Sequence, residues 1–159
     1  MSNDHEFAEK FWSSIRSDMT VMVGTKDVHP KPLTAQFDGD KRTVFFFTAK
    51  GTELADSASS PTEATLVYAS KGHDLFATVH GQLEVDNDPA LVDRLWNRFV
   101  AAWFEGGKED PKVCLLRFEP GQAEIWKDAS SFVAGIKLFL GMGDPKEDYK
   151  ESVATVDLK

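Results

Sequence analysis

Apolar residues near the start of the chain recur with the spacing of a helix. Phe7, Phe11, Trp12 and Ile15 lie three or four positions apart, with polar residues between them. Residues at this spacing share one face of an α-helix. The pattern therefore predicts an opening amphipathic helix, for which Asp4 is available as an N-terminal cap.

The pattern then changes to that of β-strands. Residues 19–25, 32–37 and 43–48 are rich in β-branched or aromatic side chains, which favour strands. An Asp-Gly-Asp turn at 38–40 separates the last two segments. These two strands are therefore expected to form a hairpin.

The middle of the chain predicts a short helix followed by two strands. Residues 51–59 are polar and compatible with a helix, which Pro61 ends. Residues 64–70 and 75–85 are the next strand candidates. Gly81 is expected to mark a β-bulge in the second of them.

The most regular helical pattern follows Asp88 and Pro89. An Asp cap with Pro at the first helical position is a start signal. The apolar residues that follow have helical spacing and predict one helix: Val92, Leu95, Trp96, Phe99, Val100 and Trp103.

The last third predicts two strands and a helix. Residues 113–118 and 122–126 read as strands on either side of a Pro120-Gly121 turn. Residues 132–140 resemble a short apolar helix, and a charged tail follows from about residue 142.

This order predicts a mainly β fold with flanking helices. Many strands without regular helical crossovers favour an antiparallel sheet, and closure into a barrel protects its edges. A length of 159 residues fits a single domain, 1–159.

Composition narrows the possible partners. The chain has 42% hydrophobic and 28% charged residues and a formal net charge of −8. Without a cluster of Lys and Arg, such a chain is not expected to bind nucleic acid or anionic membranes. No signal peptide or spanning segment is evident, so a cytoplasmic location is expected. Cys114, the only cysteine, reads as a buried core residue and rules out an intramolecular disulfide.

Motifs for independent catalysis are missing from the sequence. The four histidines do not cluster with carboxylates at metal-ligand spacings, and no metal site is expected. No dinucleotide fingerprint, phosphate loop or nucleophile elbow occurs. An enzymatic function would therefore depend on a bound cofactor.

Two segments are candidates for binding. In 46–52, an apolar strand leads into a loop where Thr48, Lys50 and Thr52 could hold a phosphate, although the same residues also fit a strand end with a surface lysine. Trp126 follows Ala-Glu-Ile and could either cover a planar ring or pack in the core. Packing in the core or at a dimer interface is the favoured interpretation for three aromatic residues of the amphipathic helix, Trp96, Trp103 and Phe104.

The ordered set of motifs resembles a known family. Those motifs are Met22-Val23-Gly24-Thr25, Lys31-Pro32-Leu33-Thr34, Phe46-Phe47-Thr48, Gly81, Leu95-Trp96, Ala102-Trp103-Phe104 with Gly106-Gly107, Leu115-Leu116 and Ala123-Glu124-Ile125-Trp126. Together they resemble the general stress protein 26 branch of the pyridoxamine 5′-phosphate oxidase-like split barrels. The resemblance spans roughly residues 7–141.

This resemblance implies a six-stranded antiparallel split β-barrel that forms a homodimer, with two FMN sites at the subunit interface. It implies that Lys31, Leu33 and Thr34 run past the flavin ring, with Phe47 and Thr48 beside them. Lys50 and Thr52 would hold the phosphate, and Trp126 would approach the flavin from the partner subunit.

The sequence also departs from the pyridoxamine phosphate oxidases proper. Those oxidases have an Arg at the start of the second strand, where this chain has Lys31 nearby. They also have a Ser-Arg-Lys run after the strand-end Thr, where this chain has Thr52-Glu53-Leu54, so two cations expected at the phosphate are missing. Lys127 to Phe132 replaces the Arg-Leu-His run that engages their substrate, so pyridoxamine phosphate oxidation is not expected.

Three functional hypotheses follow from the resemblance. The first is an FMN-dependent oxidoreductase of unknown substrate. The alternative is a non-catalytic protein that binds or senses flavin under stress. A third is a barrel that binds another planar ligand, such as haem or pyridoxal phosphate, or none.

Overall fold

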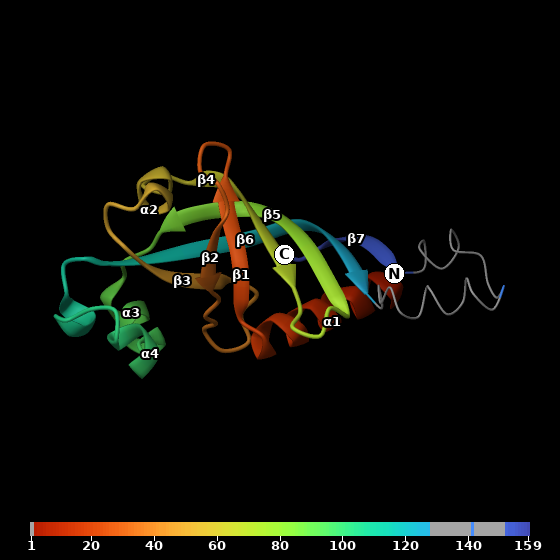
Figure 1. Cartoon of the computed structure of the whole chain (residues 1–159), viewed down its shortest axis with the longest axis horizontal. Coiled ribbons are helices and arrows are strands. Elements are labelled where there is room, and N and C mark those ends of the chain that lie inside the picture. The colour runs from red at the N-terminus through yellow and green to blue at the C-terminus, as the bar shows by residue number, and fades with distance from the viewer. Residues whose placement is uncertain (1, 128–140, 142–151) are drawn as a thin grey trace.

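The computed structural model describes residues 2–127, 141 and 152–159. Within them, one antiparallel sheet is flanked by helices (Figure 1). The elements are α1 Ser2–Ser17, β1 Thr20–Thr25, β2 Lys31–Thr34, β3 Val44–Ala49, α2 Glu53–Ser57, β4 Thr62–Ala69, β5 Leu75–Val85, α3 Pro89–Leu95, α4 Arg98–Ala101, a 3₁₀ turn Gly107–Glu109, β6 Val113–Lys127 and β7 Val153–Asp157.

The sheet curls until its two ends nearly meet. Its strand order is β2-β1-β4-β5-β6-β3, and β7 pairs with β6 outside this path. The end strands β2 and β3 connect through one isolated bridge, between Gln36 and Phe45. The mainly β split barrel is thus confirmed, with seven strands in the described sheet instead of six. The expected hairpin of 32–37 with 43–48 is wrong, because only this bridge joins the two segments.

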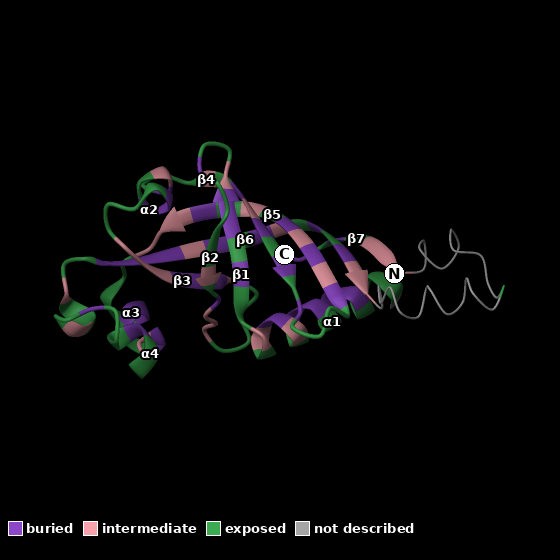
Figure 2. Ribbon diagram, viewed as in Figure 1, coloured by how far each residue is buried: buried purple, intermediate pink, exposed green. Residues whose placement is uncertain are grey.

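Helix α1 covers the main core, which the sheet encloses from the other side. It packs against β5, β6 and β7, and its apolar residues Phe7, Phe11 and Ile15 are almost fully buried (Figure 2). The predicted helix is therefore confirmed. It begins at Ser2, so Asp4 lies within the first turn rather than at the cap, where a carboxylate still favours the positive end of the helix dipole.

A second, smaller core lies where α3 and α4 meet β3 and β6. Asp88 caps α3 and Pro89 occupies its first turn, as predicted. One continuous helix to Trp103 is wrong, because Trp96 adopts an extended conformation with φ −61° and ψ 134°. Asn97 then starts α4 by accepting hydrogen bonds from the backbone N–H groups of Phe99 and Val100.

The expected turn at Pro120-Gly121 is a bulge inside one long strand, β6. Between the pairs Val79–Ala123 and Gly81–Pro120, His80 of β5 faces two residues of β6, Gly121 and Gln122. The extra residue therefore lies on β6. On β5, Gly81 is the first residue paired after the bulge. Proline lacks an N–H donor and is tolerated at such a bulge, so the strand continues where the dipeptide predicted a turn.

The remaining predictions have mixed outcomes. The short helix expected within 51–59 is α2, and the strands expected at 19–25, 64–70 and 75–85 are β1, β4 and β5. The helix predicted at 132–140 lies outside the described residues. The expected charged tail contains β7, which sequence reasoning missed.

Candidate functional site

A pocket of about 450 Å³ opens between β2 and β3 and is bordered by α4. Its volume falls within the roughly 300–1,000 Å³ typical of small-molecule sites. The lining residues come from three parts of the fold: Thr20, Pro32, Leu33, Thr34 and Gln36 from the β1–β2 side, Phe47, Thr48, Ala49 and Thr52 from the β3 side, and Phe99, Val100, Trp103 and Phe104 from the α4 side.

The first wall is the short strand β2. It pairs with β1 along one edge, with Leu33 opposite Val21 and Thr34 opposite Thr20. Pro32 removes one backbone donor, which is acceptable in an outer strand. Leu33 packs against the main core, whereas Thr34 is exposed. The wall thus presents apolar surface and a hydroxyl to the pocket.

The second wall is the end of β3 and the loop that follows it. Phe47 and Thr48 pair with Leu115 and Cys114 of β6, which fixes this strand firmly. The hydroxyl of Thr52 donates to the Ala49 carbonyl oxygen at 3.0 Å. The same hydroxyl accepts from the backbone N–H of the third residue of α2. Thr52 therefore serves first as the cap of α2, at the rim of the pocket.

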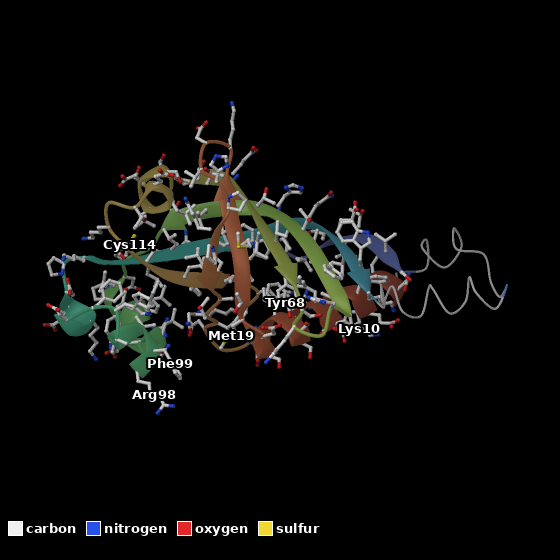
Figure 3. The ribbon with its side chains drawn as sticks, in the orientation of Figure 1. Lys10, Met19, Tyr68, Arg98, Phe99 and Cys114 are labelled. Carbon is white, nitrogen blue, oxygen red and sulfur yellow. The ribbon has the colours of Figure 1, made fainter. Side chains whose placement is uncertain are left out.

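The third wall is aromatic. The Trp96 ring packs edge-on against Phe47, with centroids 5.7 Å apart, and at a tilt of 44° against Phe104, with centroids 6.0 Å apart. Phe99 and Trp103, at the mouth of the pocket, are 69% and 85% exposed. Figure 3 shows Phe99 beside Arg98 on α4, at the edge of the molecule. The site is therefore firm on the side of the barrel and open on the side of α4.

The pocket brings together five of the eight residues that the sequence predicted for cofactor binding: Leu33, Thr34, Phe47, Thr48 and Thr52. Lys31 is exposed on β2 and is not among the lining residues. Lys50 lines a neighbouring hollow together with Asp93 and Lys108. Trp126 is half-buried on the far half of β6, opposite Phe76.

Sequence reasoning did not assign the other eight lining residues to a binding site: Thr20, Pro32, Gln36, Ala49, Phe99, Val100, Trp103 and Phe104. Two signals could have found some of them. Gln36 follows Thr34 at the two-residue spacing of a strand face, and Ala49 lies inside the predicted phosphate loop. The approach of Val100 depends on the break at Trp96, which the helical pattern concealed.

The lining side chains carry no ionisable group, within the part of the chain that the structure describes. Hydroxyls and one carboxamide offer hydrogen bonds, and the remaining surface is mainly apolar and aromatic. This combination suits a planar, largely uncharged ring system. It offers no side chain for general acid or base catalysis.

Other polar features lie apart from this pocket. An open hollow of about 950 Å³ surrounds the β6 bulge and mixes cations with carboxylates, including Lys26, Arg42 and Glu119. Cys114 is buried, and burial raises the pKa of its thiol despite the nearby Lys50 charge. Among the described residues, no cluster of metal-ligating side chains occurs and no helix is long and apolar enough to cross a membrane.

The chain is similar to several known proteins. A family model described as pyridoxamine 5′-phosphate oxidase like matches residues 6–142. General stress protein 26 of Bacillus subtilis (strain 168) is 28% identical over 95 residues, which cover 58% of this chain and only 66% of that relative's length.

Solved structures are similar over more of the chain. A general stress FMN/FAD binding protein from Xanthomonas citri is 47% identical, with a TM-score of 0.75, over 80% of this chain and 92% of that one. A general stress protein 26 candidate from Jannaschia sp. CCS1 is 31% identical, with a TM-score of 0.79, over 96% and 99%. Given the split barrel, the pocket beside β3 and these matches, the chain belongs to the pyridoxamine 5′-phosphate oxidase-like family, in its general stress protein 26 branch.

Proposed function

We propose that this protein binds FMN, with the flavin ring in the pocket between β2 and β3. The observation that carries the proposal is the convergence of five predicted ring and phosphate residues on one pocket, from segments as far apart as β2 and the cap of α2. The similarity to a relative whose name gives FMN/FAD binding supports the same ligand class.

The chemistry of the walls fits the ring. Leu33 and Phe47 provide apolar surface for a planar tricyclic system, and Thr34, Thr48 and Gln36 provide hydrogen bonds for its polar edge. Flavin rings need both kinds of contact because one edge is hydrocarbon and the other carries nitrogen and oxygen. The pocket therefore fits the ring without an ionisable partner.

The phosphate requires positive charge, which the lining does not supply. We place it at the β3 end of the pocket, near Thr48 and the rim formed by Thr52. Lys50 lies between these two residues in the chain, and its side chain is exposed. In this proposal the flexible Lys50 side chain rotates so that its ammonium leaves the neighbouring hollow and faces this rim. Lys31, on the opposite wall strand, is the second candidate cation.

The site is proposed to be completed by a second copy of the chain. Met22 and Val67 are paired neighbours on the outer face of the sheet and are 40% and 39% exposed. Phe76 and Trp126 pair with each other on the same face, two residues along the strands from the row that contains Met22 and Val67. Phe99 and Trp103, by α4, add two strongly exposed aromatic side chains that a second copy could cover. We propose that this surface forms the homodimer, with Trp126 of the partner subunit reaching the flavin.

Two activities are compatible with such a site. Bound FMN would supply hydride transfer, and this chain would bind and orient the ring and limit access of water. Oxidoreductase activity on an unidentified substrate is therefore the first candidate. A carrier or sensor of flavin is the second, and the lack of an ionisable side chain among the described lining residues favours it.

A titration of apo-protein with FMN, followed by visible absorbance and flavin fluorescence, tests the proposal. We expect saturation at one FMN per chain. Bleaching of the bound flavin by NAD(P)H, with reoxidation by an added acceptor over many cycles, would support the oxidoreductase. Binding without turnover would support the carrier. Failure of FMN to bind at micromolar concentration would refute the flavin proposal.

A further inference from the structure

The two strands that flank the pocket are held together at one point only. Within the described residues, the backbone groups of Gln36 and Phe45 form the single bridge between the β2 and β3 segments, with N···O distances of 2.8 and 2.9 Å. A full ladder would fix the distance between two strands along their whole length. β1 and β6 hold the outer edges of β2 and β3, so on the side where the two strands face each other their separation depends on this bridge and on what holds the turn that joins them.

That turn is tied to helix α3 by an ion pair. Asp38, in the turn, accepts hydrogen bonds from Nε and Nη2 of Arg94 at 3.3 and 3.0 Å. It also accepts one from Lys41 Nζ at 3.1 Å. The Asp38 side chain is only 16% exposed. The Arg94 guanidinium, followed by Lys41, holds the pKa of this carboxyl below its ordinary value. Two parallel bonds from one guanidinium specify geometry as well as attraction.

The other side of the turn is tied to helix α1. Arg16 donates to the carbonyl oxygens of Gly39 and Lys41 at 2.8 and 3.0 Å. Its guanidinium also lies over the Phe37 ring, 4.6 Å from the centroid. The turn is therefore held between α1 and α3.

Helix α3 leads directly into the third wall of the pocket. Trp96 ends α3 and packs on Phe47, and α4 with Phe99 begins two residues later. The Asp38–Arg94 pair thus connects the turn between the first two walls to the helix that carries the third. Neither residue lines the pocket itself.

We propose that Asp38 and Arg94 are positioning residues that set the opening of the flavin pocket. This inference rests on the proposed function for its effect on ligand binding. Its effect on the Gln36–Phe45 bridge is independent of any ligand.

The test compares Arg94→Gln with Lys10→Gln. Lys10 lies on α1 and pairs with Glu6 at 3.5 Å, and it lines neither the pocket nor the hollow around Lys50. The two side chains are similarly exposed, 51% for Arg94 and 47% for Lys10. Each variant therefore removes one exposed ion pair from a helix. They differ in whether the β2–β3 turn is released.

Two quantities are measured well below the melting temperature: the FMN dissociation constant, and the hydrogen-exchange rates of the Gln36 and Phe45 amides. Arg94→Gln should raise both by about fivefold, the scale of a well-formed exposed ion pair. Lys10→Gln should change neither by more than about twofold. Asp38→Asn should match Arg94→Gln, and the double variant should be no worse than either single one.

The outcomes are separable. Equal effects of Arg94→Gln and Lys10→Gln, additive losses in the Asp38→Asn/Arg94→Gln double variant, or faster exchange with unchanged FMN affinity would each overturn the proposal. If the unaltered protein does not bind FMN, the proposed function fails. The exchange rates then still decide whether this ion pair holds the bridge.

Discussion

Gly81 offers a sharp test of how β5 and β6 are held together. A methyl group added at this position would overlap the Glu119 carbonyl oxygen and would lie 2.7 Å from the Phe118 ring. Both approaches are closer than van der Waals contact, and the first involves backbone that cannot rotate away. Gly81→Ala must therefore push the strands apart at the bulge. Overpacking of this kind costs about 1–3 kcal/mol.

Gly72→Ala is the matched control. Its added methyl would meet only Asp74 Oδ1, at 3.8 Å, so the fold should accommodate it. For a chain of this length, each kcal/mol lowers the melting temperature by roughly 2–4 °C. Thermal and urea unfolding of the two variants should show a loss of several degrees for Gly81→Ala and almost none for Gly72→Ala. Equal stabilities would refute the close approach of the two strands.

Three further predictions concern the site and the core. Lys50→Ala should weaken FMN about tenfold by removing a charged phosphate donor, and riboflavin should be unaffected in the same fluorescence titration; equal losses would remove Lys50 from the phosphate. Trp126→Ala should raise the emission of bound FMN and change the melting temperature little, since Trp126 is only half-buried opposite Phe76; a large fall in stability with unchanged emission would mean a purely structural role. Burial raises the pKa of Tyr68 above its ordinary value of 10.0, although its hydrogen bond with Ser14 acts in the opposite direction. The neutral phenol therefore stabilises the fold below pH 10, and this contribution should be lost as the pH rises through the raised pKa; alkaline melts of Tyr68→Phe should fall less steeply than those of the unaltered protein, and parallel curves would contradict this.

Local sequence signals predicted most of the elements because they act over a few residues. The helical spacing of Phe7, Phe11 and Ile15 and the cap-proline pair at Asp88 and Pro89 both appear as predicted. Two of the wrong predictions share a cause, because each depends on a strand that is distant in the sequence. Pro120-Gly121 forms a bulge because β5 pairs along β6, and the segments at 32–37 and 43–48 do not form a hairpin because β2 pairs with β1 and β3 pairs with β6.

The sequence also predicted part of the candidate site. The family resemblance implied Leu33 and Thr34, and the loop that follows the strand at 43–48 indicated Thr48; the pocket contains all three. The α4 wall was not predictable as a wall, because Phe99 and Trp103 have the spacing of an uninterrupted helix face. Only the extended conformation of Trp96 turns them toward the pocket mouth, and no local rule distinguishes a tryptophan that ends a helix from one that continues it.

The most direct test of the central claim is to fill the pocket. Thr34 lies on the pocket wall with an exposed side chain, and tryptophan is well tolerated in strands. Thr34→Trp should therefore block the space between β2 and β3 without disturbing the core, whereas Thr34→Ser retains the hydroxyl and adds no volume. In an FMN titration, we predict that Thr34→Ser binds one FMN per chain and that Thr34→Trp, with an unchanged melting temperature, binds none. Equal FMN affinity in the two variants would show that the flavin does not occupy this pocket.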